Sequence, residues 1–269
     1  MDMNEEIIVR ESFIVILDSR NATRYLNGTY NSNIIFEFED AIKTKGNSIK
    51  MNACLNSFCM PNSLYIINEY NFLLSITILG ITTNYNILLG NYNAQTFMNQ
   101  LIIQLGSTFS ITLNQITNQF TLINSTNDFI INSTSTIYQI MGFIQNTQYN
   151  SILKSITFPY LCNFNGYQNI NINIENINTE NIDSLCKSNS SIIASIQIDS
   201  TLQQINYNKT NDFKFEIKDN VLSYIQLSLR DDLENLINLN NQHFNLTIQF
   251  EELINIKRYR NSFHNILNI

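Results

Sequence analysis

The residues Phe244 to Phe250 read F-N-L-T-I-Q-F, so large apolar side chains alternate with polar ones. Successive side chains of a β-strand point to opposite faces of its sheet, so this alternation predicts a strand with one buried and one wet face. Near the other end of the chain, Ser12 to Asp18 read S-F-I-V-I-L-D, and the turn residues Asp18-Ser19-Arg20-Asn21 end this run. A short β-branched run of this kind predicts a buried strand followed by an exposed loop.

Other segments with a period of two lie on both sides of the middle of the chain. They comprise residues 34–39, 49–57, 170–174, 192–198, 213–217 and 224–229. Because such strands both precede and follow the middle part, they predict one antiparallel sandwich made from the two ends of the chain. The predicted fold class is therefore mainly β. A single eight-stranded jelly roll is the simplest β-sandwich with this strand count.

The period changes in the middle of the chain. Phe97, Leu101 and Leu105 recur at four-residue intervals, with Asn93 as N-cap and Gly106 just beyond the end, which predicts an amphipathic helix. Short strands are expected at 109–113, 120–123 and 129–131, and a short helix at 133–142. These elements predict a small α+β domain inserted into the jelly roll. The predicted boundaries are 1–84 and 147–256 for the jelly roll, 85–146 for the inserted domain and 257–269 for a basic C-terminal tail.

Charge is scarce in this chain. Only 14% of the residues are charged, 44% are hydrophobic, and the net charge is −7. Nucleic-acid binders usually concentrate Lys and Arg, so nucleic acid is expected to bind only weakly if at all. The first ten residues contain Glu5 and Glu6 and lack the basic and apolar regions of a secretory signal. No apolar run approaches the roughly 18 residues of a membrane span, so none is predicted.

Motifs that carry catalysis or bind cofactors are missing from the sequence, which has no glycine-rich phosphate loop, no GxSxG and no HExxH. The two histidines, His243 and His264, are expected to have surface or packing roles. The chain is therefore expected not to be an enzyme and to need no cofactor or metal. Asp231, Asp232 and Glu234 could together bind a cation, but a solvated β-turn is the favoured interpretation because Asp at strand ends binds its own turn backbone.

The four cysteines show no CxxC spacing and lie in apolar strand patterns or in an Asn/Ser loop. Free cysteine behaves as a small buried hydrophobe. Reduced, structural thiols are therefore expected at Cys54, Cys59, Cys162 and Cys186.

Three side chains are candidates for contacts with other molecules. An isolated arginine in a low-charge chain can anchor an interface through two hydrogen bonds, so Arg20 is either an interface clasp or part of a turn. Tyr85 and Tyr92 lie at the entry to the inserted domain. They could stack sugars or line a subunit contact, although aromatics spaced along strands most often belong to the core.

In the order of its pieces the chain resembles the penton, or minor capsid, proteins of virophages and polinton-like viruses, and especially those of Sputnik-like virophages. The resemblance covers nearly the whole chain. The segments that carry it are Ser12-Phe-Ile-Val-Ile-Leu-Asp-Ser-Arg20, Asn56-Ser-Phe-Cys-Met-Pro-Asn-Ser-Leu-Tyr-Ile-Ile-Asn68, Gly90-Asn-Tyr92, Met141-Gly-Phe143, Ile225-Gln-Leu-Ser-Leu-Arg-Asp-Asp232, Ile237-Asn-Leu-Asn-Asn241 and Phe244-Asn-Leu-Thr-Ile-Gln249.

This resemblance implies a structural capsid protein with a single jelly roll and an inserted domain, five copies of which close the icosahedral vertex of a double-stranded DNA virus or virophage. It implies a homopentamer whose neighbours are trimers of a double-jelly-roll major capsid protein. The protein would be made in the host cytoplasm or virus factory and would reside in the virion. The family supplies no catalytic residues.

Two further expectations follow. Lys257, Arg258 and Arg260 form the one basic cluster, and we expect this tail to face internal acidic material or a neighbouring capsomer. Deleting the residues after Glu252 would then leave pentamers intact but weaken incorporation into the capsid.

The alternative function is a jelly-roll carbohydrate-binding or host-attachment module. In this alternative the inserted domain binds a host surface polymer, and Tyr92→Ala abolishes glycan binding.

Overall fold

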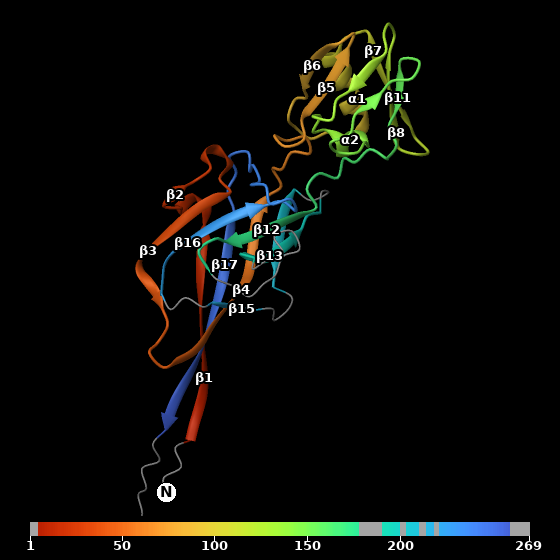
Figure 1. Cartoon of the computed structure of the whole chain (residues 1–269). Helices are drawn as coiled ribbons and strands as arrows, with labels where there is room; N and C mark the ends of the chain where they lie inside the picture. The colour runs from red at the N-terminus through yellow and green to blue at the C-terminus, as the bar shows by residue number, and fades with distance from the viewer. Residues whose placement is uncertain (1–4, 178–189, 200–202, 210–213, 218–220, 259–269) are drawn as a thin grey trace, which may run out of the picture. The chain divides into compact units, whose positions relative to one another are not determined.

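The computed structural model describes residues 5–177, 190–199, 203–209, 214–217 and 221–258 (Figure 1). The chain forms two compact units. Unit 1 comprises Met1–Ser63 and Gln168–Ile269, and unit 2 comprises Leu64–Tyr167. Nearly all elements are antiparallel strands, which confirms the predicted mainly β class.

The first sheet of unit 1 joins the two ends of the chain. Its strand order is β1-β17-β4-β14, with β15 also paired to β4. All fourteen residues of β1 pair with β17, from Glu5 opposite Arg258 to Asp18 opposite Asn245. This pairing confirms that strands from the two ends of the sequence share one sheet. The bounds are Glu5–Asp18 for β1, Asn245–Arg258 for β17, Ser48–Pro61 for β4, Gln204–Asn208 for β14 and Phe215–Ile217 for β15.

The second sheet of unit 1 has the order β13-β12-β16-β3-β2. Its three central strands have a strand neighbour on each side, and each contributes a fully buried apolar side chain, namely Ile172, Leu227 and Ile34. A hydrogen bond from the Tyr25 hydroxyl to the Ser19 carbonyl (2.6 Å) ties this sheet to the end of β1. The bounds are Ile192–Gln197 for β13, Asn169–Ile174 for β12, Val221–Arg230 for β16, Asn33–Lys43 for β3 and Arg24–Tyr25 for β2.

Unit 2 contains two smaller sheets and the helices α1 and α2. One sheet has the order β10-β9-β5-β6 and the other the order β11-β8-β7. The bounds are Leu73–Ile78 for β5, Ile81–Asn86 for β6, Ala94–Leu105 for α1, Phe109–Asn114 for β7, Gln119–Asn124 for β8, Phe129–Ile131 for β9, Tyr138–Met141 for α2, Tyr149–Asn150 for β10 and Ser155–Thr157 for β11.

The predicted helix of the middle region is confirmed in detail. Asn93 caps α1 by accepting from the Thr96 backbone N–H (2.9 Å), and Thr96 returns a bond to the Asn93 N–H. Phe97 and Leu101 are fully buried on one face of the helix. The predicted strands at 109–113, 120–123 and 129–131 are present as β7, β8 and β9, and the short helix α2 lies inside the predicted range 133–142.

The boundaries of unit 2 differ from those of the predicted inserted domain, residues 85–146. The hairpin of β5 and β6 belongs to unit 2 because Ile76 of β5 pairs with Ile131 of β9. On the other side, β11 pairs with β8, and Phe158 is fully buried in the same core. Strands β5 and β6 show a period of two like those of unit 1, so periodicity alone does not separate the two units.

Candidate assembly surface

Strand β1 forms an open edge of the first sheet. Among the strands that the structure describes, β1 pairs only with β17. An edge strand of this length presents a row of backbone N–H and C=O groups that another chain can bind. The opposite edge consists of the short strands β14 and β15. Short edge strands offer few backbone groups with which another chain could pair.

The centre of β1, residues Ser12–Ile16, is uncharged and apolar. Ile14 and Ile16 lie on the outer face, where 57% and 71% of their surfaces are exposed. Ile8, on the same face, is 64% exposed. On the other face Phe13 stacks on Phe250 with ring centroids 5.2 Å apart. We define the β1 edge as residues Ile8–Ile16. Its outer side pairs with no strand in the described part of the chain, and its exposed large side chains stand beside the charged residues Arg10 and Glu11.

The prediction that Ser12–Asp18 is a buried strand is therefore wrong, because Ile14 and Ile16 on the outer face and Phe13 on the other face are exposed. Of the large side chains in this stretch, only Leu17 is buried. The apolar run looks like a strand covered on both faces, because Phe13, Val15 and Leu17 alternate with Ile14 and Ile16. The sequence carries no signal that β1 lies at an edge, since this depends on which distant strands pair with it.

The turn after β1 is held by both local and distant contacts. The Asp18 side chain accepts from the backbone N–H of Arg20 (2.9 Å) and from its guanidinium Nε (2.9 and 3.0 Å). These contacts hold the pKa of Asp18 below its usual value. Ser19 is buried; its hydroxyl accepts from the Phe244 N–H (2.9 Å) and lies 3.2 Å from Nδ1 of His243. His243 therefore has the packing role that was expected.

Arg20 lies in the turn that follows β1, and its side chain remains 64% exposed although its guanidinium binds Asp18. The turn interpretation of Arg20 is confirmed, and its role in an interface stays a prediction. Lys257 and Arg258 are the last residues of β17, where their backbones pair opposite Glu6 and Glu5. The predicted tail thus begins inside a strand, and a deletion after Glu252 also removes β17 residues that pair with β1. Arg260 and His264 lie outside the described residues.

Tyr85 and Tyr92 pack against the core of unit 2. The Tyr92 ring meets Phe97 edge to face with centroids 6.4 Å apart, and its hydroxyl donates to the Leu88 carbonyl (2.8 Å). Burial raises the pKa of Tyr92. This packing accounts for both rings without a ligand, so Tyr92→Ala would disturb the core as well as any surface contact.

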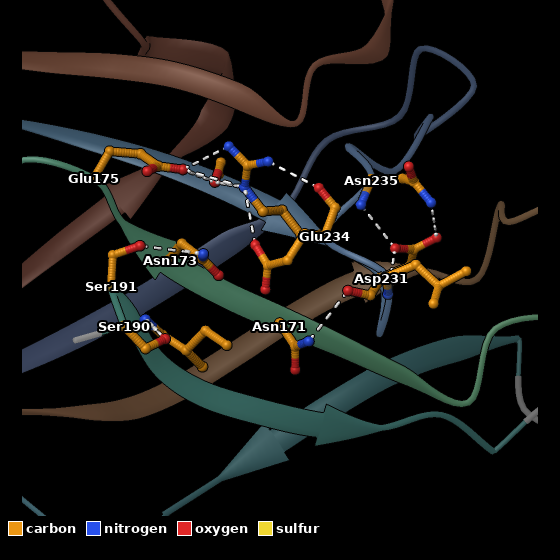
Figure 2. Close-up of polar contacts among 12 residues, drawn as sticks. Asn171, Asn173, Glu175, Ser190, Ser191, Asp231, Glu234 and Asn235 are labelled. Atoms are coloured by element: carbon orange, nitrogen blue, oxygen red, sulfur yellow. Dashed lines mark hydrogen bonds and ion pairs between the residues drawn. The ribbon is translucent and has the colours of Figure 1, made fainter. Parts of the chain in front are cut away.

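The acidic residues after β16 form a turn, as the favoured interpretation predicts (Figure 2). The Asp231 carboxylate accepts from the backbone N–H groups of Leu233 (2.9 Å) and Asn235 (2.8 Å) and from the Asn235 side chain (3.0 Å). Asp232 accepts from the side chain of Asn169 (3.2 Å). Within the described ranges, no group of three or more His, Cys, Asp or Glu residues could hold a metal ion.

Next to this turn, Arg230 and Glu175 form a half-buried ion pair (Figure 2). The guanidinium donates to the Glu175 carboxylate through Nη2 (2.9 Å) and Nε (3.2 Å), and through Nη1 to the Glu234 carbonyl (2.9 Å). Ser228 donates to the same Glu175 oxygen (2.5 Å). This polar clasp, residues Glu175, Ser228 and Arg230, fixes the end of β16 to the segment after β12. The Oε1 oxygen of Glu175 accepts from both Ser228 and the guanidinium of Arg230.

Cys54, Cys59 and Cys162 are free thiols, and Cys54 is buried. Cys186 lies outside the described residues. No helix in the described part of the chain is long and apolar enough to cross a bilayer.

No family model matches the sequence, and no curated protein matches it. Among solved structures, the penton protein of mavirus is similar to this chain. The alignment covers 92% of this chain and 99% of that protein, with 10% sequence identity and a TM-score of 0.47.

Proposed function

We propose that this chain is a structural, non-catalytic capsid protein that forms the vertex of an icosahedral virus or virophage. Two findings support the proposal. The sequence segments resemble those of penton proteins over nearly the whole chain. The structure then has the arrangement that this resemblance implies, in which both chain ends complete one β unit around an inserted α+β unit.

The observation that carries the proposal is the β1 edge. A protein rarely leaves an exposed apolar stretch at an open sheet edge, because such an edge pairs with other chains. Here Ile14 and Ile16 are well exposed, and neither Lys nor Pro interrupts the stretch Ser12–Ile16. Neighbouring copies in an assembly would cover this surface. Assembly through the β1 edge would bury residues that otherwise promote aggregation.

A vertex requires a closed ring of five copies, in which one flank of each subunit meets the opposite flank of the next. Each chain then needs two different complementary patches, and we assign the β1 edge to one of them. The low charge of the chain favours such contacts, because uncharged polar side chains are easier to desolvate than Lys or Glu. In this proposal unit 1 is a jelly roll and forms the ring. Trimers of a major capsid protein surround it in the virion.

The mass of the protein in solution tests this assignment. Light scattering across a concentration series should find a species of five times 31.2 kDa. The double variant Ile14→Lys/Ile16→Lys places two charges on the outer face of β1 and should shift the population to monomer. Ile116→Lys is the matched control, since Ile116 is 94% exposed in unit 2 and should tolerate the same change without loss of the ring.

A wild-type chain that stays monomeric at every concentration would contradict self-assembly through this edge. A ring that persists in the Ile14→Lys/Ile16→Lys variant would place the contact elsewhere on the subunit. Circular dichroism of both variants distinguishes a lost interface from a lost fold.

A further inference from the structure

Two tight turns in unit 2 place leucine where the backbone is left-handed. Leu79 and Gly80 join β5 to β6, with φ of 49° and 80°. Leu153 and Lys154 join Ile152 to Ser155, with φ of 52° and 65°, and the backbones of Ile152 and Ser155 bond to each other in both directions. Two-residue turns with positive φ at both positions strongly prefer Asn-Gly.

The choice of leucine is unusual for this chain. Outside these two turns, the described non-glycine residues with positive φ are all asparagine except Glu234. The asparagines are Asn31, Asn118, Asn146, Asn240 and Asn241. Leucine in this conformation lowers the stability of the fold, because its Cβ crowds the following carbonyl. Asparagine at positions 79 and 153 would give a more stable fold, so folding does not explain the two leucines.

Both turns lie at the same end of one sheet. Ile78, just before the first turn, pairs with Phe129 of β9, and Ser151, just before the second, donates its N–H to the Phe129 carbonyl. We define the apolar tip as Leu79, Ile81, Ile152 and Leu153, whose side chains are 80%, 71%, 78% and 90% exposed. Four large apolar side chains therefore point into solvent at one end of the sheet β10-β9-β5-β6.

The second turn is held firmly. The Asp128 carboxylate accepts from the Lys154 backbone N–H (2.7 Å) and from the Ser151 hydroxyl (2.9 Å). The chain enters and leaves unit 2 near the other end of this sheet, where Ile67 pairs with Gly90 and the Gly166 backbone lies against Ile66. The apolar tip is thus presented at the end of unit 2 that carries no chain connection.

The size and charge of the apolar tip decide which ligand it suits. A stable protein interface covers about 800 Å² on each partner and some 20–30 residues. Four side chains on two turns make a much smaller surface, whereas insertion into a lipid interface requires no matching shape. Unit 2 contains only three charged residues, Glu69, Asp128 and Lys154, and the last two lie beside the tip with opposite signs. Attraction to anionic lipid is therefore not expected.

We propose that the apolar tip inserts into the interfacial region of a bilayer of zwitterionic lipid. Leu79 and Leu153 would enter deepest, because they occupy the turns themselves, and Ile81 and Ile152 would follow. The driving force is burial of apolar surface, so binding should depend little on salt.

Flotation of the full chain with phosphatidylcholine vesicles tests the proposal. Wild-type protein should float with the vesicles at low and high salt alike. The double variant Leu79→Asn/Leu153→Asn should bind at least about tenfold more weakly for each leucine removed, since a buried leucine contributes at least a factor of ten to partition. Asparagine suits the left-handed backbone, so this variant should fold as well as the wild type, which circular dichroism checks.

Ile116→Asn is the matched control, because Ile116 is 94% exposed on the loop between β7 and β8. This loop joins the end of β8 opposite to the end that pairs with Ser155, so it lies away from the tip. Its vesicle binding should equal that of the wild type. The proposal is overturned if wild-type protein fails to float, which would favour a protein partner for the tip. Equal binding of the double variant, or binding only to phosphatidylserine vesicles at low salt, would also overturn it. The mass of the double variant in solution should stay that of the wild type, so this test is independent of ring formation.

Discussion

Units 1 and 2 both expose large apolar side chains, but they do so in different ways. In unit 1 the two most exposed of these side chains, Ile16 and Ile8, lie along β1, where the edge of the sheet adjoins them. In unit 2 four of them lie on two turns at one end of a sheet. A strand edge can bind a second protein chain through backbone hydrogen bonds. A few apolar side chains on turns can instead insert into a lipid surface, which requires no matching shape. On this basis we propose self-assembly through unit 1 and a lipid contact through unit 2.

The units also differ in charge and in continuity along the chain. All but three of the charged residues belong to unit 1, including the half-buried pair Arg230 and Glu175. Unit 2 is one continuous segment, while unit 1 requires both chain ends to meet. Ion pairs therefore help to fix unit 1, whereas unit 2 depends on apolar packing and on hydrogen bonds, including those to the Asp128 carboxylate.

Truncation after His243 should have the largest effect on this comparison. It removes β17, the strand between β1 and β4, and unit 1 should lose its protection against hydrogen exchange entirely. Unit 2 should keep protected amides around Phe97 and Phe120, because its core comes from one continuous segment. Truncation after Arg258 is the control and should leave both units protected. Loss of protection in both units after the first truncation would show that they do not fold separately.

Replacing Arg230 by Met should destabilise unit 1 by about 1–3 kcal/mol, because the half-buried Glu175 carboxylate loses its charged partner. Arg24→Met is the matched change at an exposed pair with Glu37, and it should cost no more than about 1 kcal/mol. Chemical denaturation, monitored through hydrogen exchange of the unit 1 amides, measures the free energy of unfolding of both variants. Equal effects of the two variants would remove the distinction between the polar clasp and an ordinary surface pair.

Leu79→Asn should raise the stability of unit 2 by up to about 1 kcal/mol, because asparagine tolerates the left-handed backbone of the turn better than leucine. Thermal unfolding of the variant measures this change. A lower stability would mean that Leu79 contributes to the fold, and the argument that it is kept for binding would lose its basis.

The smallest expected effect concerns pH. The Lys154 N–H and the Ser151 hydroxyl hold the pKa of Asp128 below the usual range of an aspartate. A lowered folded-state pKa means that the carboxylate stabilises the turn above the unfolded-state pKa, and that this contribution is lost as pH falls through the folded one. The Lys154 amide resonance should therefore titrate in the wild type with a midpoint below that of an aspartate in an unstructured peptide, and it should not titrate in Asp128→Asn. A midpoint equal to or above that of the peptide would contradict the hydrogen bonds between Asp128, Lys154 and Ser151.

Much of the fold was predictable because strand and helix periods are local. The alternation of Phe244–Phe250 and the spacing of Phe97, Leu101 and Leu105 gave the correct elements. The unit boundaries were not predictable in the same way, because β5 and β6 share their period with unit 1 and join unit 2 only through pairing with β9. Pairing between distant strands leaves no mark in a single sequence.

The candidate surface was harder to predict than the fold. The apolar stretch Ser12–Ile16 was identified as a strand, but its exposure depends on β1 being last in its sheet. Tyr85 and Tyr92 were candidates for ligand contacts, and their packing in unit 2 follows from core neighbours far along the chain. Leu79-Gly80 offered a usable signal, since leucine before glycine in a two-residue turn marks a position where folding alone would favour asparagine.

The central claim is that β1 is covered when the protein assembles. Hydrogen exchange read by mass spectrometry across a dilution series tests it directly. As the mass in solution rises to the assembled species, the peptide containing Phe13–Ile16 should become protected while the turns at Leu79 and Leu153 stay unchanged. Assembly that leaves β1 as accessible as in the monomer would contradict the claim.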